Sequence, residues 1–390
     1  MKNSALLALT AAATALPGIA QAQQIAEQFE FGVRHHAYDE EPISASETLS
    51  PQLDRYDIDV NQFRLVAPLS ENWQLNLDYQ RETMSGASPW YTFQLPGEGV
   101  KQIMSGASIE DTRTDVSASA TYAWDRKGIT FGIATSDEDD YESTSASLAY
   151  SFESEDRLRT YSFSTDYSDD EVSPVDADIF LTRPTTTQDK ESYSFLFSLS
   201  QILNKNSIAK FSVSVARKKG YLSDPYKLVF VDNNLIGDSR PDQKTSKTFA
   251  VQYRYFADEL NGALHADYRY YDDNWDISSN TLKLAWYQNL GMGFQLVPSI
   301  RWYSQDEAYF YQTFYTDTRD DGFYSTDYRL SEYGATTYGL KLSKRFDNWS
   351  LSLSAEKYES GGSDVLADAS IENPGLLDFD LITFGFDIYY

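Results

Sequence analysis

The end of the chain carries the pattern that most restricts its fold. Apolar side chains occupy every second position from Ile382 to Tyr390. Successive side chains of a β-strand point to opposite faces, so this segment predicts a strand with one apolar face. Two structures fit it: a buried last strand of a soluble domain, or the closing strand of a transmembrane β-barrel.

The same alternation recurs in fifteen earlier segments, which favours the barrel. Short polar turns follow the even strands and long loops follow the odd strands, a sorting that a soluble β-sandwich has no reason to show. We therefore predict an all-β, antiparallel transmembrane barrel of about 16 strands, with short periplasmic turns and long extracellular loops. The last strand should pair with the strand around Phe29–Val33, and Pro298 should cause a bulge or a local weakness. The predicted strands lie near 28–37, 57–66, 73–79, 116–124, 129–133, 146–152, 161–163, 193–199, 211–215, 249–255, 264–270, 282–286, 294–302, 338–342, 351–355 and 382–390.

The start of the chain predicts a secretory leader. Lys2 precedes an apolar run from Ala5 to Leu16, and Ala20-Gln21-Ala22 supplies the small residues of a cleavage site. The run is too short to span a bilayer. We expect residues 1–22 to be a signal peptide and residues 23–390 to be one barrel domain in the outer membrane of a Gram-negative bacterium.

The amino-acid composition restricts which molecules the chain can bind. The chain has 29 Tyr, 22 Phe and 7 Trp, a surplus that aromatic girdles at both membrane interfaces would use. It has no Cys, which excludes disulfides and thiol chemistry, and a net charge of −27, which argues against nucleic acid. The expected partners are outer-membrane lipid, lipopolysaccharide and the barrel-assembly machinery. The terminal aromatic resembles the signal that this machinery reads, and the predicted signal residues are Phe384, Phe386, Ile388 and Tyr390.

If the apolar faces meet lipid, the alternate residues line the lumen. From the fourth to the ninth strand these are mostly Ser, Thr, Ala and Gly, whereas other strands place charges there. Facing charges would set a transverse field that sorts solutes, as in a porin eyelet; alternatively, they pair across strands and only neutralise one another. A barrel this wide needs a solvated path, an inward loop or a guest protein. The predicted lumen residues are Arg64, Asp78, Arg254, His265, Asp267, Arg269, Lys283, Arg301, Lys341 and Glu356.

One of six long loops contains a repeated word. Met84-Ser85-Gly86-Ala87-Ser88 recurs as Met104-Ser105-Gly106-Ala107-Ser108, with Trp90, Tyr91 and Phe93 between the copies. Small residues allow close backbone approach, so we expect the two copies to pack together or to line a narrow space; a flexible surface loop is the alternative. The long loops are predicted at 39–54, 85–111, 168–189, 218–244, 304–331 and 359–378, and one or more of them could fold inward.

The words around this repeat resemble the signature of an uncharacterised bacterial family, classed as a domain of unknown function and predicted to be outer-membrane. The two words are Ser85-Gly86-Ala87-Ser88-Pro89-Trp90-Tyr91 and Ser105-Gly106-Ala107-Ser108-Ile109-Glu110-Asp111-Thr112-Arg113. The resemblance covers most of the mature chain and brings no catalytic residues. Members tend to be encoded near flavin-transfer proteins and small lipoproteins, which implies a barrel that sheaths a periplasmic or lipoprotein partner, possibly a redox protein.

Signals of catalysis and metal binding are weak. His35 and His36 point to opposite faces of a strand, and His265 with Asp267 is accompanied by no nucleophile motif. Two acidic clusters, Ser136–Asp140 and Asp317–Gly322, are interpreted as solvated loops rather than as sites for divalent ions. We predict no enzyme, no cofactor and no metal. The preferred function is a channel for small hydrophilic solutes, and the alternative is the structural sheath.

Overall fold

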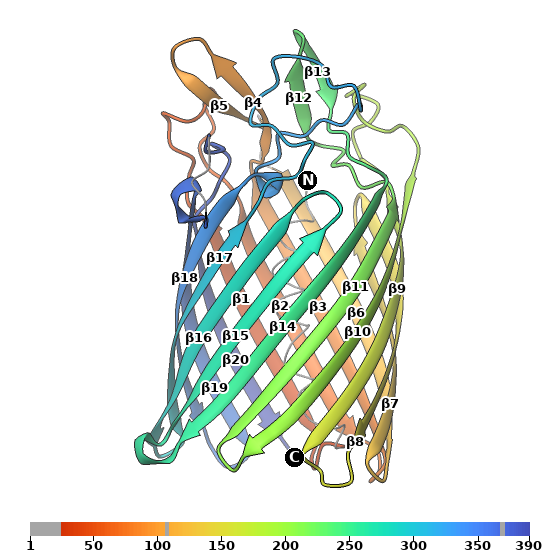
Figure 1. Ribbon diagram of the computed structural model, residues 1–390, viewed down its shortest axis with the longest axis vertical. Coiled ribbons are helices and arrows are strands. Elements are labelled where there is room, and N and C mark those ends of the chain that lie inside the picture. The colour runs from red at the N-terminus through yellow and green to blue at the C-terminus, as the bar shows by residue number, and fades with distance from the viewer. Residues whose placement is uncertain (1–24, 106–108, 367–370) are drawn as a thin grey trace.

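The structure is a computed structural model that describes residues 25–105, 109–366 and 371–390. These residues form a closed antiparallel barrel of 16 strands, which confirms the predicted fold class (Figure 1). The predicted leader, as well as Gly106 and Ser108 of the repeat, lies outside the described residues. The barrel strands are β1 (Glu30–Glu40), β2 (Asp57–Pro68), β3 (Trp73–Gly86), β6 (Ile109–Trp124), β7 (Lys127–Glu138), β8 (Tyr141–Glu153), β9 (Arg159–Val172), β10 (Gln188–Asn204), β11 (Ser207–Gly220), β14 (Gln243–Ala257), β15 (Gly262–Asp273), β16 (Ser278–Gly291), β17 (Phe294–Gln305), β18 (Tyr333–Arg345), β19 (Trp349–Gly361) and β20 (Phe379–Tyr389).

The last strand closes the barrel on the first. β20 pairs with β1 so that Ile388 lies opposite Phe31 and Phe386 opposite Val33, as the alternation predicted. The backbones of Phe29 and Tyr390 exchange two hydrogen bonds, of 3.0 and 2.9 Å. Closure leaves no strand edge unpaired, which a sheet in lipid requires because lipid cannot hydrogen-bond a free edge.

The register separates an apolar outer face from a polar inner face. Phe131, Phe195 and Leu353 are among many large apolar side chains that are exposed on the outer face. Such a band is typical of a wall in contact with lipid. At the end with the short turns, a chain of ring contacts runs along the outer face of β3, β6, β8 and β9, as expected for an aromatic girdle. Its members are Trp73, Tyr122, Trp124, Tyr150, Phe152 and Tyr161.

Three local expectations need correction or refinement. The sequence predicts a long loop after every odd strand, but two connections at that end are tight turns, at 139–140 and 274–277. The acidic cluster Ser136–Asp140 is therefore not a solvated loop: β7 runs to Glu138, and the side chains of Glu138 and Asp140 are buried. Around Pro298 the ladder to β16 lacks bridge pairs, but the register on both sides is unchanged. The ladder to β16 is therefore weakened at Pro298 without a bulge. On the other side, pairing to β18 continues through Pro298.

Most of the buried apolar clusters involve the long loops; a further one, of Tyr38, Tyr56, Ile58 and Met84, lies at the rim of β1, β2 and β3. Segments 41–54, 87–105, 173–187, 221–242, 306–332 and the described part of 362–378 fold together, and we call them the cap. They include the hairpins β4 (Pro89–Leu95) with β5 (Gly99–Met104) and β12 (Leu228–Val231) with β13 (Asn234–Gly237), which rise above the barrel in Figure 1. Three buried clusters hold cap segments together: Trp275, Ile277, Ala308, Phe310, Tyr311 and Leu330; Val229, Val231, Tyr315 and Tyr324; and Ile43, Ala87 and Met104.

Helices are short and lie at loops. In the described parts of the chain they are the 3₁₀ turns η1 (Asp258–Leu260), η2 (Tyr328–Leu330) and η3 (Gly362–Asp364). The described residues form no helix that is long and apolar enough to cross a membrane. The cap consequently owes its order to hairpins, side-chain clusters and polar contacts between loops.

Candidate functional site

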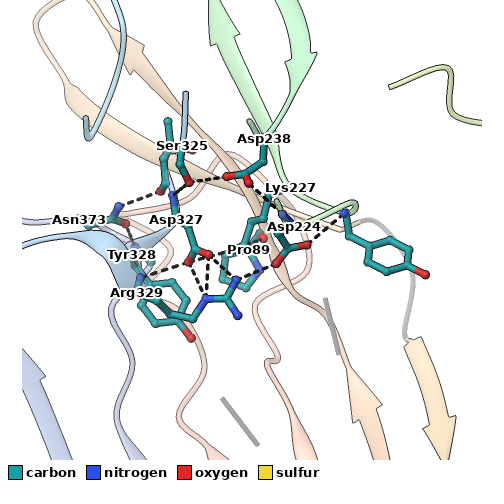
Figure 2. A network of polar contacts seen from close by, with 12 residues as sticks. Pro89, Asp224, Lys227, Asp238, Ser325, Asp327, Tyr328, Arg329 and Asn373 are labelled. Carbon is teal, nitrogen blue, oxygen red and sulfur yellow. Dashed lines mark hydrogen bonds and ion pairs between the residues drawn. The ribbon is translucent and has the colours of Figure 1, made fainter. Parts of the chain in front are cut away.

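A network of buried charges lies at the centre of the cap (Figure 2). Asp327 accepts hydrogen bonds from Arg329 Nε at 2.8 Å and from Arg240 Nη2 at 2.9 Å. Arg329 also reaches Asp224 at 2.7 Å, and Arg240 reaches Asp238 at 2.7 Å. Lys227 Nζ lies 4.0 Å from Asp327. Three carboxylates thus face three cations, so the network is neutral as a whole.

The network ties loops that start on distant parts of the barrel. Lys227 Nζ, in the loop after β11, donates to the carbonyl of Pro89, in the loop after β3, at 2.7 Å. Five other strands separate β3 from β11 in the closed order. Asn373, in the loop after β19, donates to the carbonyl of Thr326, in the loop after β17, at 3.1 Å. Loops from different sides therefore meet over the mouth of the barrel.

Because the network is buried, the charged state of each member is stabilised mainly by its partners. The side chains of Asp238 and Asp327 have no exposed surface. Burial raises the pKa of Asp327, but Arg329, Lys227 and Arg240 outweigh it and hold that pKa well below 3.8. Burial also lowers the pKa of Lys227 to about 8, against the opposite effect of Asp327. A buried network is stable only while all members are satisfied, so it favours one arrangement of the cap.

Below the cap, inward side chains at the rim form an acidic arc and a basic arc. The acidic arc lies on neighbouring strands from β3 to β9, and its members are Glu82, Asp111, Asp115, Glu138, Asp140 and Asp170. The basic arc follows on β10, β11 and β14 with Lys190, Lys218 and Lys244. A cavity of about 320 Å³ lies against this basic arc, and Arg240 and Arg329 of the cap also line it.

The middle lysine of the basic arc is the least compensated cation. Lys190 pairs with Asp170 at 3.1 Å, and Lys244 pairs with Asp273 at 2.8 Å. For Lys218, the described residues place no carboxylate oxygen within 4.0 Å of its Nζ. Its side chain is exposed, and it lines the cavity. The site can therefore attract an anionic group on one side and a cationic group on the other.

Aromatic side chains occupy a further arc of the rim, from β17 to β1. Tyr303 and Tyr333 have ring centroids 5.7 Å apart, and Tyr358 stacks on Phe379 at 4.6 Å. Tyr38 completes the row, 4.6 Å from Phe379. These residues come from β17, β18, β19, β20 and β1 in unbroken order. The mouth therefore presents an acidic, a basic and an aromatic arc in turn.

The ten predicted lumen residues all lie on the inner face. Register pairs join Arg64 with Asp78, Asp267 with Lys283, and Lys283 with Arg301. The remaining members share that face through the registers of β14, β15, β18 and β19: Arg254, His265, Arg269, Lys341 and Glu356.

Some of these charges neutralise one another and others remain open to the lumen, so both alternatives raised by the sequence are represented. Arg254 pairs with Asp267 at 2.5 Å, so part of the wall neutralises itself. Arg64 lies 3.7 Å from Asp78, yet their side chains remain 51% and 49% exposed. Water therefore reaches the lower wall. Whether these residues guide solutes stays a prediction.

The histidines lie in structural positions. His35 points outward near Asp59, whereas His36 points inward and contacts Thr383 and Gln62. His265 packs against the ring of Tyr287, with centroids 4.0 Å apart. Asp267 is engaged by Arg254 rather than by His265. The arrangement therefore offers no oriented histidine base at this position.

The two copies of the repeated word contact each other. The Ser88 N–H donates to Ser105 Oγ at 3.0 Å, and the Ser105 N–H donates to the Ser88 carbonyl at 2.8 Å. Gly86 has a φ of +133°, and a Cβ there would lie 2.0 Å from the Arg55 carbonyl oxygen. Beyond the repeat, Trp90 packs edge-on against Phe180, while Ser85 and Glu110 face each other across β3 and β6. The described parts of the two copies are therefore packed together where β3 meets the cap.

These observations define the class of protein: an outer-membrane-type β-barrel with a folded cap at its long-loop end. The chain belongs to the family described as "Protein of unknown function (DUF3570)", whose model matches residues 6–377. This confirms the resemblance to an uncharacterised family, although the two signature words are not tested separately. No curated protein matches the chain by sequence.

Solved structures resemble this chain over most of its length. A bacterial polysaccharide outer membrane secretin matches with 8% identity and a TM-score of 0.50, covering 93% of this chain and 98% of that one. CdiB from Acinetobacter baumannii matches with 9% identity and a TM-score of 0.50, covering 94% and 60%. The siderophore receptor PirA from Pseudomonas aeruginosa matches with 12% identity and a TM-score of 0.45 over 87% of this chain, which spans 57% of that receptor. At these identities the likeness shows the fold alone.

Proposed function

We propose that the protein is an outer-membrane channel for small hydrophilic solutes and that the cap gates its extracellular mouth. The observation that carries this proposal is the exposed, charged inner wall, with Arg64 and Asp78 each about half exposed. Sixteen-stranded barrels are wide enough to leave an aqueous path. In this proposal the predicted leader exports the chain, and the assembly machinery inserts it into the membrane.

The arcs of the mouth give the proposed channel its selectivity. Neighbouring acidic and basic walls create a field across the path, which favours solutes that carry both charges or a compact anionic group. Lys218 is the side chain best placed to meet an anion, because it is exposed and lies within the cavity. The side chains of the aromatic arc offer flat apolar surfaces to the same solute.

Recordings from the purified full chain in planar bilayers test the proposal. We expect discrete conductance steps and, in a salt gradient, a shift of the reversal potential toward cation selectivity in Lys218→Glu. Lys219→Glu is the matched control, because Lys219 points to the outer face of the same strand. A folded protein that never conducts, even with its cap destabilised, refutes the channel. Equal selectivity of the two variants refutes the role of the basic arc.

The structural sheath remains a second candidate, favoured by the wall of small side chains. Gly132, Ser147, Ser162, Ser198 and Ser212 lie on the inner face from β7 to β11 and give a smooth surface. Since the cap covers one end, a guest protein would enter from the short-turn end. Mild-detergent purification from the native cell tests this: a stoichiometric periplasmic or lipoprotein partner supports the sheath, and a conducting barrel always isolated alone refutes it.

A further inference from the structure

Three buried carboxylates converge where β6 meets the turn between β7 and β8. One oxygen from each of Asp111, Glu138 and Asp140 lies within 4.8 Å of the other two. All three residues are buried. They belong to the acidic arc and lie directly beneath the cap, at the end of the barrel away from the short turns.

Within the described ranges, Glu138 finds no hydrogen-bond donor for its carboxylate. Its side chain is 2% exposed, and neither of its oxygens accepts a hydrogen bond from any described residue. Arg113 Nε lies 3.6 Å from Oε1, but it donates to Asp115 and Ser136, both at 3.0 Å. Burying a charged group without hydrogen bonds is costly. A ligand that supplies positive charge to these oxygens would remove that cost.

Among the residues that the structure describes, positive charge is scarce around the cluster. Glu82 and Asp115 also lie near Arg113, the cation closest to these acids. Arg183 also lies near Asp140, but it pairs with Asp176 and covers the ring of Tyr226 at 4.6 Å. Carboxyl groups are therefore concentrated in a buried site that offers them little compensating charge.

We propose that Asp111, Glu138 and Asp140 bind a divalent cation, with Ca²⁺ as the preferred ion. Ca²⁺ takes six to eight oxygen ligands at about 2.4 Å, so opposite ligands lie about 4.8 Å apart. The oxygens of this cluster fall within that spacing. The cluster offers carboxylates with no nitrogen or sulfur, a set that suits Ca²⁺ better than a transition metal. Water completes the coordination.

Such an ion would also act on the cap. Asp140 accepts a hydrogen bond from the hydroxyl of Tyr226, which lies in the cap loop after β11. Asp111 belongs to β6 and Glu138 to β7, so one ion would join two strands and, through Tyr226, a loop from elsewhere on the ring. Bound Ca²⁺ is therefore expected to slow opening of the cap.

Calcium titration of the full chain in detergent, after chelator treatment and dialysis, tests the site. We expect one Ca²⁺ with a Kd of about 10⁻⁴ to 10⁻³ M, the range of extracellular modules. Glu138→Gln should weaken this binding by at least about tenfold. Asp137→Asn is the matched control, because Asp137 is an exposed neighbour on the outer face of the same strand. Heat-dependent migration on gels verifies that both variants are folded barrels.

A second measurement needs no variant at the ligands. Tb³⁺ at this site should emit on tyrosine excitation, be displaced by Ca²⁺, and hold fewer waters than the free ion. Tyr226→Phe should reduce that emission. Equal Ca²⁺ binding by wild type, Glu138→Gln and Asp137→Asn overturns the proposal. So does a wild type with no Ca²⁺-displaceable Tb³⁺ emission, whichever variants fold.

Discussion

Replacing Asp327 with Asn should open the cap while leaving the barrel folded. Asp327 is the acid that all three cations of the central network approach, and its side chain has no exposed surface. The substitution keeps the shape of the side chain and removes its charge. The network then holds Asp224 and Asp238 against three cations, one of them uncompensated.

The size of the effect follows from burial. Removing one partner of a buried ion pair typically costs about 3–5 kcal/mol, because it leaves a buried charge unpaired. At about 1.4 kcal/mol for each factor of ten, the population of open caps should rise by about 10² to 10⁴ fold. The barrel wall should not respond, since these residues belong to loops and not to the strand ladders.

Hydrogen exchange of the cap amides is the direct assay, with channel recordings as the functional counterpart. Asp321→Asn is the control: Asp321 pairs with Arg319 in the same loop, but its side chain is 33% exposed. An exposed pair contributes at most about 1 kcal/mol, so exchange should change by less than about tenfold. Asp327→Asn should also raise the open probability. If the two variants protect the cap equally, the network does not hold it closed.

A charge-balanced double variant separates loss of charge from loss of contacts. Adding Lys227→Met to Asp327→Asn leaves two acids facing two arginines, so the remaining network is neutral again. Because an apolar replacement of a balanced pair is often nearly neutral in stability, the double variant should recover part of the lost protection. A double variant that is as open as the sum of both single variants would show that charge balance is irrelevant.

Three further outcomes follow from the structure. The network cations hold the pKa of Asp327 well below 3.8, despite burial, so its stabilising contribution is complete above about pH 4 and is lost as the pH falls further. The protection of the cap amides, measured against their intrinsic exchange rate at each pH, should therefore fall near pH 3, and it should fall less in Asp327→Asn. Gly86→Ala should destabilise the cap by about 1–3 kcal/mol in denaturant titrations, because its Cβ would meet the Arg55 carbonyl oxygen at 2.0 Å, whereas Gly97→Ala, at a φ of +84° with open space around it, should cost less. Deleting Tyr390, which is 79% exposed, should lower the level in the outer membrane more than the stability of the assembled barrel, as membrane fractions and heat-modifiability would show.

The barrel could be predicted from the sequence because lipid imposes a rule on every second residue. Each strand must be apolar wherever its outer face meets lipid, and this produces a signal that sixteen segments repeat. The same reasoning explains where the prediction stops. β10 begins at Gln188 and β11 ends at Gly220, several residues beyond their apolar alternation. Above the membrane the outer face meets water, and polar residues such as Glu191 are then acceptable there.

The basic arc was hidden for this reason. Lys218 and Lys244 stand on strand ends that the sequence predicts as a long loop, and Lys190 borders another predicted loop. On a regular strand, every second residue faces the same side along its whole length. The inward positions of these strands can therefore be counted past the last apolar residue. That parity places Lys190, Lys218 and Lys244 inward. Strand parity, rather than apolarity, is the better guide to the residues that line the mouth of a barrel.

The cap follows no period and depends on contacts between distant segments. Phe93 meets Phe230, and Thr92 donates to the carbonyl of Thr313. No local pattern encodes such pairs. One signal was nevertheless present: residues 309–315 contain Tyr, Phe, Tyr, Phe and Tyr within seven positions, which is unusual for a loop surrounded by water. A solvated loop gains nothing from so many aromatic side chains, whereas a folded cap needs them for its core.

The two parts of the molecule are therefore stabilised by different means. The wall is held by a closed ladder of backbone hydrogen bonds in lipid, where an open edge is prohibitively costly. The cap must fold in water from small apolar clusters and a neutral set of buried charges, so a few kcal/mol decide whether it is closed. Protonation of one acid or binding of one cation lies on that scale. If the cap gates a channel, as we propose, that gate can respond to pH and to divalent ions while the barrel stays intact.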